Sequence, residues 1–382
     1  MSTLKTTNLQ HASAASPAIV LASDGTATAQ LSSLNDGPLS GARNRIINGD
    51  MRIDQRAASV TTGAYTVDRW EYQTSAASKF TIGQNTAAPT GFVNSLLATS
   101  SSAYSVAAGD YFSVQQKIEG TNTADLAWGT ASAKTVTLSF YVRSSLTGTF
   151  GGSIKNSAVN RSYPFSYTIS AANTWEQKSI TIPGDTSGTW LTTTGIGMNV
   201  CFSLGAGSTF SGTAGAWAAA EYFTATGATS VVGTNGATFY ITGVQLEAGS
   251  VATPFERRSY GQELALCQRY CPAISYYTNG GDRFLGAAGS TTNSNPIVNF
   301  QVTPRTAPTG LTVSSAGHWA VYNKRLAAGG AATAIALSSA GANTAELSVT
   351  TTAGSPTLAA GDAIVLYPSN SSALMIFTGC EL

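Results

Sequence analysis

Short stretches of alternating apolar and polar residues recur along most of the sequence after residue 43. In residues 135–142, Val136, Leu138 and Phe140 share one side of an extended chain, since successive side chains of a strand point to opposite faces. Clusters of Gly, Ser, Thr and Asn separate these stretches and are typical of loops. Many short strands with hardly any helical periodicity predict an all-β protein built around an antiparallel sandwich. Similar stretches occupy residues 178–182, 197–202, 237–244, 296–302, 318–322 and 362–366.

The pattern divides the chain into four parts. Residues 43–258 fit one large sandwich, and residues 273–382 predict a second, smaller β-domain, with a linking segment at residues 259–272. Residues 1–42 are small and polar, and their one apolar run, at residues 18–22, is followed by an Asp-Gly pair that indicates a hairpin. This first segment is too short to hold a core of its own, so we expect it to pack on another chain or a larger assembly.

One short helix is expected in the linking segment. Ser259 and Gln262 have the spacing of a capping box, and Pro272 would end the helix. Such a helix could lie at the axis of a trimer or pack on its own domain. Its apolar residues fall on one stripe at helical spacing: Tyr260, Leu264, Cys267 and Cys271.

Composition and charge limit the partners. Only 10% of the 382 residues are charged and the formal net charge is +1, so neither nucleic acid nor anionic lipid is an expected partner. No run approaches the roughly 18 apolar residues of a membrane span, and no secretory signal follows Met1, so we expect folding in the cytosol. The four cysteines form no CxxC pair, which predicts reduced, partly buried thiols rather than disulfides or a zinc site.

No constellation of catalytic residues is apparent. The two histidines, His11 and His318, lie in different parts of the chain, and Gly-x-Ser-x-Gly, HExxH and phosphate-loop motifs are missing from the sequence. We therefore expect no enzyme activity, no catalytic residue, no cofactor and no metal. A triad built on His318 and a polysaccharide hydrolase stay open, because a glycosidase needs only two suitably placed carboxylates. The carboxylates considered are Asp50 with Asp54, Glu119 with Asp125, and Asp282.

The aromatic residues are a better guide to function. Sugar sites combine an aromatic platform with Asn, Asp and hydroxyl partners. Trp70 is expected in the core, whereas Trp128, Trp190 and Trp217 lie among Gly, Ala and Thr and are candidates for an exposed platform, the alternative for each being a place in the core. The candidate glycan-binding residues are Trp128, Trp190, Trp217, Asp282, Trp319 and Tyr322.

Two stretches resemble the ends of a jelly-roll module found in bacteriophage tail fibres and related virion proteins. Residues 44–56 (NRIINGDMRIDQR) and 65–70 (YTVDRW) resemble its opening. Residues 239–257 (FYITGVQLEAGSVATPFER), which continue into residues 263–270 (ELALCQRY), resemble its last strand and exit. These stretches bracket the sandwich that the alternation predicts.

The module is also similar to carbohydrate-binding jelly rolls that begin with Asn-Gly-Asp, as at residues 48–50 here. In those proteins the last strand bears an Asp used for structural calcium. Thr242 and Gly243 stand at the corresponding place, which speaks against calcium. No sugar-binding residue can be carried over, because the loops that would hold it lie in the variable middle of the module.

The resemblance implies a non-enzymatic virion protein, a tail fibre or receptor-binding protein. Residues 1–42 would attach a homotrimer to other virion proteins, the jelly roll would form the body, and the C-terminal β-domain would contact host cell-surface polysaccharide. Such a protein is assembled in the host cytoplasm and exposed on the particle, which accounts for the missing secretion signal. The alternatives are a structural head fibre, capsid decoration or baseplate protein, and a glycan hydrolase or esterase on the same scaffold.

Overall fold

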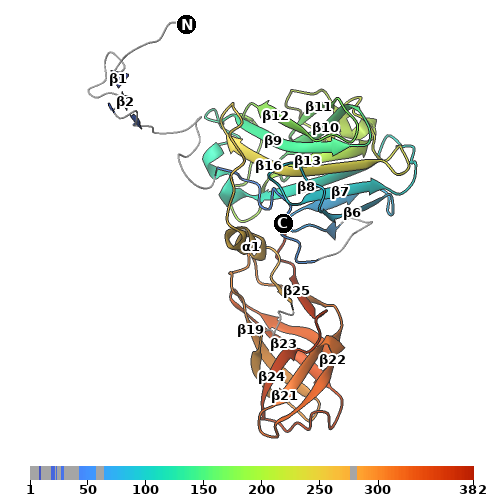
Figure 1. The fold of residues 1–382 in the computed structure, drawn as a ribbon, viewed down its shortest axis with the longest axis vertical. Coiled ribbons are helices and arrows are strands. Elements are labelled where there is room, and N and C mark those ends of the chain that lie inside the picture. Colours follow the sequence, from blue (N-terminus) through green and yellow to red (C-terminus); the bar gives the residue numbers. More distant parts are fainter. Residues whose placement is uncertain are drawn as a thin grey trace.

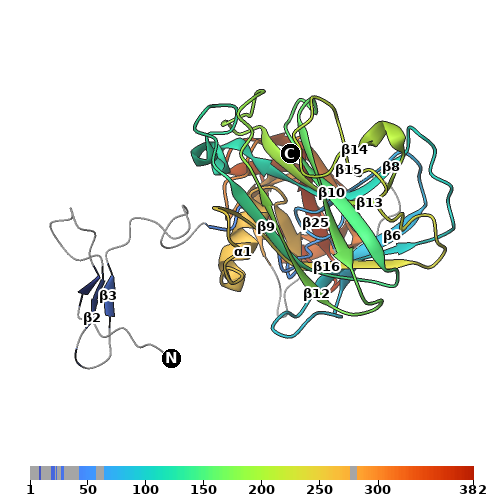
Figure 2. The same ribbon diagram turned by 90° about the horizontal axis from the view of Figure 1, so that it is seen from above.

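The computed structural model describes residues 43–56, 64–275 and 282–382, together with residues 8–9, 19–21, 23 and 27–29. Within these residues the protein is almost entirely β, with one α-helix, and the predicted all-β jelly-roll class is confirmed. Figure 1 shows the sandwich above and a closed barrel below, with the helix between them. Figure 2 shows the sandwich from above, with the barrel partly hidden behind it.

The sandwich consists of two antiparallel sheets. One sheet has six strands in the order β11-β10-β13-β8-β5-β4, and the other has five in the order β12-β9-β16-β7-β6. The strands of the six-stranded sheet are β4 (Ala64–Tyr65), β5 (Glu71–Thr74), β8 (Tyr111–Glu119), β10 (Gly148–Lys155), β11 (Ser162–Ile169) and β13 (Ile196–Ala206). Those of the five-stranded sheet are β6 (Phe80–Asn85), β7 (Ser95–Ser100), β9 (Val136–Ser144), β12 (Glu176–Ile182) and β16 (Thr238–Ala248).

Alternation along the strands builds the sandwich core. Val136, Leu138 and Phe140 of β9 are buried between the sheets, as their spacing predicts. Trp70 is fully buried there, and its prediction as a core residue is also confirmed. The short elements outside the two sheets are the parallel pair β14 (Ser211–Gly212) and β15 (Thr224–Ala225), and the 3₁₀ turns η1 (Gly120–Asn122), η2 (Ala124–Leu126) and η3 (Ser208–Phe210).

The two stretches that resemble the module's ends lie against each other. The side-chain amide of Asn48 donates to the carbonyl of Asp68 (3.0 Å), and its main-chain N–H donates to the Glu263 carboxylate (2.5 Å). Gly49 accepts a hydrogen bond from the N–H of Val244 in the last strand (2.9 Å), and a Cβ on Gly49 would lie 2.1 Å from the carbonyl oxygen of Val244. The Asn-Gly-Asp segment therefore closes the sandwich against β16 and the helix.

The helix α1 spans Tyr260–Gln268, and the predicted capping box is present: Ser259 accepts from the N–H of Gln262, whose side chain accepts from Ser259. The helix ends earlier than expected, before Cys271 and Pro272. Tyr260 is 58% exposed, so the predicted apolar stripe is wrong at its first position. Cys267 and Tyr270 pack in a small core with Ile47 and Ile53 of the sandwich.

The chain after the helix forms a closed six-stranded barrel, in the order β18-β19-β23-β22-β21-β24, and a three-stranded sheet, β17-β25-β20. The barrel strands are β18 (Phe284–Ala288), β19 (Asn293–Asn299), β21 (Trp319–Asn323), β22 (Ala328–Ala340), β23 (Thr344–Thr351) and β24 (Ala363–Pro368). The remaining elements are β17 (Ala273–Ser275), β20 (Gly310–Val313), β25 (Leu374–Thr378) and η4 (Ala316–His318).

The residues after β25 join the barrel to the sandwich. The Glu381 carboxylate forms ion pairs with Arg69 and with Arg56 (2.9 Å). The main-chain oxygen of Leu382 accepts from the hydroxyl of Tyr65 (2.9 Å). Both contacts bring the chain back beside the start of the sandwich, where the label C lies in Figure 1.

Strand pairs are also present in the first segment. Strands β1 (Asn8–Leu9), β2 (Ile19–Leu21) and β3 (Ala27–Ala29) form a three-stranded antiparallel sheet. The pairing of β2 with β3 confirms the predicted hairpin, although Asp24 and Gly25 lie outside the described residues.

Candidate functional site

Three of the predicted glycan-binding residues come together, but not as an exposed platform. The rings of Trp128, Trp190 and Trp217 contact one another nearly edge to face, with centroids 4.7 to 5.6 Å apart. Trp128 is 6% and Trp190 is 8% exposed, and each of the three indole N–H groups donates to a protein oxygen. Three loops converge here and bury the rings, so the expectation of an exposed platform is wrong for Trp128 and Trp190. Trp217 is half-buried.

The other three predicted residues lie in the barrel domain. Trp319 is fully buried in the barrel core beside Phe284, where a glycan cannot contact it, so its prediction as a glycan-binding residue is wrong. Tyr322 is half-buried on the outer side of β21, with the ammonium of Lys324 5.3 Å from its ring centroid. Asp282 is exposed at a cleft.

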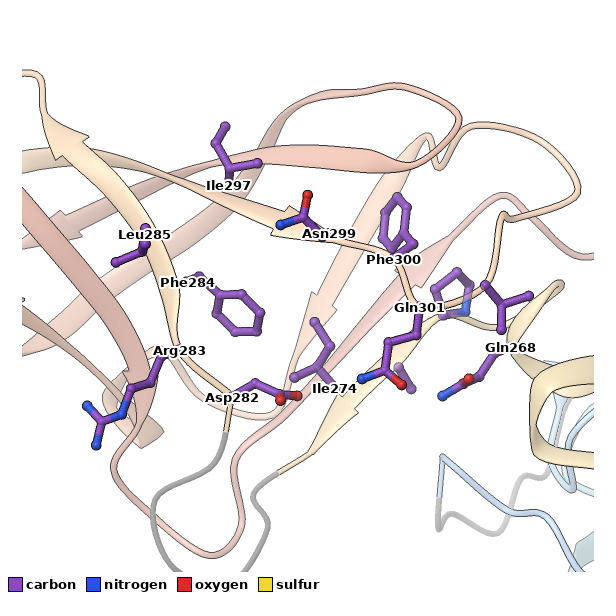
Figure 3. Close-up of a pocket in the computed structure, with 13 residues that line it drawn as sticks. Gln268, Ile274, Asp282, Arg283, Phe284, Leu285, Ile297, Asn299, Phe300 and Gln301 are labelled. Carbon is purple, nitrogen blue, oxygen red and sulfur yellow. The ribbon is translucent and has the colours of Figure 1, made fainter. Parts of the chain in front are cut away.

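This cleft has a volume of about 430 Å³ and lies between the end of α1 and strands β18 and β19 (Figure 3). Gln268, Asp282, Asn299 and Gln301 supply its polar groups, whereas Arg283 points away from them. The apolar lining includes the exposed side chain of Leu285. The lining also includes the rings of Phe284, which is 8% exposed, and Phe300, and it holds only one carboxylate, which does not fit a pair of catalytic carboxylates.

Three of the carboxylates considered for hydrolysis, Asp50, Asp125 and Glu119, are held by arginines. Asp50 pairs with Arg52, and Asp125 pairs with Arg45 (2.6 Å). Two hydrogen bonds join Glu119 to Arg269 (2.7 and 3.0 Å), and the hydroxyl of Tyr270 donates to it as well (2.6 Å). Burial opposes ionisation of Glu119, but these donors lower its pKa below the usual value. Such arrangements hold the fold together rather than leave an acid or base free.

Neither His318 nor the four cysteines have surroundings that would activate them for catalysis. His318 Nδ1 lies 3.0 Å from the hydroxyl of Ser314, which also donates to the carbonyl of Ser372. No carboxylate contacts His318 among the described residues, so a triad is not assembled there. All four cysteines are free and buried, and burial raises the pKa of Cys271 and Cys380.

The outer side of the five-stranded sheet carries a group of aromatic side chains that the sequence analysis missed. Tyr141 and Arg143 alternate along β9 with the core residues of that strand. Strand register places Arg143 opposite Tyr240 of β16, and Tyr141 opposite Gln177 of β12. These strands lie side by side in Figure 1. The surface, called the aromatic face below, comprises Phe92, Tyr141, Arg143, Trp175, Gln177, Tyr240, Phe255 and Arg257.

One half of the aromatic face is centred on Tyr240. The Arg143 guanidinium lies 5.0 Å from its ring centroid, and the Trp175 ring lies 6.0 Å away in an edge-to-face arrangement. All three side chains are partly exposed. Cation–π and edge-to-face contacts of this kind fix ring orientation before any ligand arrives.

The other half is centred on Phe92. Its ring lies 5.3 Å from both Tyr141 and Phe255, and the Arg257 guanidinium lies 4.7 Å from its centroid. Gly243 has a φ of 60°, and a Cβ there would lie 2.7 Å from the Phe92 ring. Gly243 stands at the place where a calcium-binding Asp would be expected, and its lack of a side chain leaves room for the Phe92 ring.

Neither a metal-binding cluster nor a membrane-spanning helix is present in the part of the chain that the structure describes. No group of three or more His, Cys, Asp or Glu side chains there is arranged to hold a metal ion. None of its helices has the length and apolar character needed to cross a bilayer.

Comparisons with known proteins find similarity only among solved structures. No family model and no curated protein matches the sequence. The enzymatically active domain of bacteriophage CBA120 tailspike protein 4 is 13% identical with a TM-score of 0.32, over 54% of this chain and 21% of the tailspike chain. This chain thus spans about a fifth of that tailspike.

Carbohydrate-binding modules give similar scores. A family 4 module is 13% identical with a TM-score of 0.29, over 53% of this chain and 97% of the module. A family 11 module from Clostridium thermocellum, in complex with a mixed-linked tetrasaccharide, is 12% identical with a TM-score of 0.27, over 51% of this chain and all of the module. The assignment of the fold depends on the strand order and register of the two sheets and not on these comparisons.

Proposed function

We propose that this protein is a non-enzymatic, glycan-binding component of a bacteriophage virion, and that the aromatic face binds the glycan. The observation that carries the proposal is the continuous set of partly exposed rings on the outer side of the five-stranded sheet. Sugars present apolar C–H faces that stack on such rings, and hydroxyl edges that hydrogen-bond to amides, phenols and guanidinium groups.

The aromatic face offers both kinds of group within one surface. Trp175, Tyr240 and Tyr141 supply rings, and Gln177 and Arg143 supply hydrogen-bonding groups between them. Side chains two residues apart on a strand are separated by about 7 Å, so Tyr141 and Arg143 can contact neighbouring sugar units of one chain. Their contacts with one another hold these groups in place, which reduces the entropy lost when a ligand binds.

In this proposal the aromatic face binds the glycan without cleaving it. Asp50, Asp125 and Glu119 are engaged with arginines, and none of the carboxylates considered for hydrolysis belongs to the aromatic face. Incubation with a bound polysaccharide should therefore release no new reducing ends and no acetate.

The virion role rests on the resemblance of the sandwich ends to phage fibre modules. In this proposal the first segment attaches the protein, as a homotrimer, to another virion protein, and the sandwich presents the aromatic face to the host surface. Electron microscopy of labelled particles tests the location. Distal copies would agree with receptor contact, and copies on the capsid face would replace this role by decoration.

Substitutions on two surfaces test the binding site. Trp175→Ala and Tyr240→Ala should each reduce glycan binding about tenfold or more, because loss of a stacked ring is typically worth more than 1 kcal/mol. Tyr322→Ala is the matched control, since Tyr322 is also a half-buried tyrosine with a stacked cation, but it lies on the barrel. Binding lost in Tyr322→Ala and kept in the other two would move the site to the barrel.

A further inference from the structure

We infer that the glycan bound by the aromatic face is acidic, with carboxylates that pair with Arg143 and Arg257. This inference rests on the proposed function and specifies its ligand. The protein has few charges, and their distribution supports an acidic ligand.

Most arginines of the sandwich and the helix have a carboxylate partner. Ion pairs engage the guanidinium groups of Arg45, Arg52, Arg56, Arg69, Arg161, Arg258 and Arg269. Within the described residues, the guanidinium groups of Arg43, Arg143 and Arg257 have neither an ion pair nor a hydrogen bond, and the last two lie on the aromatic face. A chain with so few charges thus leaves two cations unpaired on the same surface.

The local carboxylates cannot serve these two arginines, because other groups already engage them. Glu176 accepts from Lys178 (2.6 Å) and from the N–H groups of Ser170 and Ala171. The amide of Gln245 and the N–H and hydroxyl groups of Thr253 donate to Glu247, which is 2% exposed. Glu256 accepts from the N–H of Asn44 (2.7 Å) and lies 3.8 Å from Arg258. The aromatic face therefore has a local excess of positive charge.

The arginines also have the geometry to bind a carboxylate beside a sugar ring. Each guanidinium lies over an aromatic ring, Arg143 over Tyr240 and Arg257 over Phe92, so its plane is supported from one side. The Nε of Arg143 is buried without a partner, while its terminal nitrogens reach solvent. A guanidinium held in this way can form two parallel hydrogen bonds with a carboxylate.

A neutral glycan would leave Arg143 and Arg257 without a counter-charge, whereas a chain of uronic acids would supply a carboxylate to each. Its pyranose faces would stack on Trp175 and Tyr141, and its carboxylates would meet the guanidinium groups. Because the pairs would be partly exposed, binding should weaken as salt is added.

The experiment measures binding of the full chain to immobilised alginate, hyaluronan and polygalacturonate, and to dextran, galactan and xylan. Acidic polymers should bind at least tenfold more tightly, and carbodiimide activation of their carboxylates followed by borohydride reduction should abolish the difference. Arg143→Gln and Arg257→Gln should each weaken acidic binding about tenfold. Lys324→Gln is the matched control, because Lys324 is an unpaired cation over a ring of the barrel.

The possible outcomes distinguish a failure of the acidic ligand from a failure of the proposed function. Neutral polymers that bind as tightly as acidic ones, with no effect of the arginine substitutions, would overturn the acidic ligand and leave glycan binding intact. No binding to any polymer would overturn the proposed function together with this inference. Acidic binding lost only in Lys324→Gln would assign the ligand to the barrel.

Discussion

Replacing Glu381 by Gln should loosen the connection between the sandwich and the barrel. The Glu381 carboxylate is the counter-charge of Arg69, whose side chain is 1% exposed. Arg69 also donates to the carbonyl of Lys117 (2.6 Å), and its guanidinium stacks 3.6 Å from the ring centroid of Tyr270. Burial opposes the charge of Arg69, but the Glu381 carboxylate raises its pKa, so the guanidinium stays charged in the folded protein.

The magnitude follows from these contacts. Removing one partner of a buried ion pair typically costs 3–5 kcal/mol, because the remaining charge is left without compensation. Glu381 is 14% exposed, and glutamine keeps one acceptor oxygen. We therefore expect a loss just below this range, about 2–3 kcal/mol in the free energy of unfolding.

Urea unfolding followed by tryptophan fluorescence measures this loss. Trp319 is the one tryptophan of the barrel and the other five precede the helix, so a Trp319→Phe background reports on the sandwich, and its difference from the wild-type signal reports on the barrel. Glu346→Gln is the control, since Glu346 accepts only from Asn295 and Ser338 and has no cation partner. A Glu381→Gln variant within 0.5 kcal/mol of the wild type would refute the reasoning.

Three further predictions concern stability. Burial raises the pKa of Asp68 to about 6, above the value of about 4 in an unfolded chain, so its contribution to stability is present below pH 4 and is lost as pH rises through 6. The free energy of unfolding of the wild type, measured with urea, should therefore fall by about 2–3 kcal/mol between pH 4 and 7 because of this group, and Asp68→Asn should flatten that fall. Ser259→Ala removes the capping box and should cost about 1 kcal/mol in the same assay; an unchanged midpoint would mean that the cap is dispensable. Gly49→Ala should cost several kcal/mol or prevent folding, because its Cβ would clash with Val244, whereas Gly109→Ala has open space and should be nearly neutral. Equal thermal stability of these two variants would contradict the packing described at Gly49.

The sequence predicted features that depend on local pattern. Val136 and Leu138 lie in the core because alternation determines the buried face of a strand whichever strands pair with it. The capping box at Ser259 depends on a few neighbouring residues and was also predicted. The end of the helix was misplaced because Tyr270 turns into the core beside Glu119 instead of continuing the helix.

Features that require distant segments to meet were not predicted. Trp128 and Trp190 lie among small polar residues, which suggested exposure, but their loops fold onto one another and bury the rings. In the aromatic face, the alternation along β9 places Tyr141 outside the core. Its partners Phe92 and Phe255 come from loops, and their convergence depends on strand register, which no local pattern specifies.

A crystal structure of the protein with its tightest-binding oligosaccharide tests the central claim most directly. We expect a sugar ring in van der Waals contact with Trp175 or Tyr240, and a ligand oxygen within hydrogen-bonding distance of Arg143. A sugar bound instead in the cleft beside Asp282 or against Tyr322, with the aromatic face empty, would contradict the account.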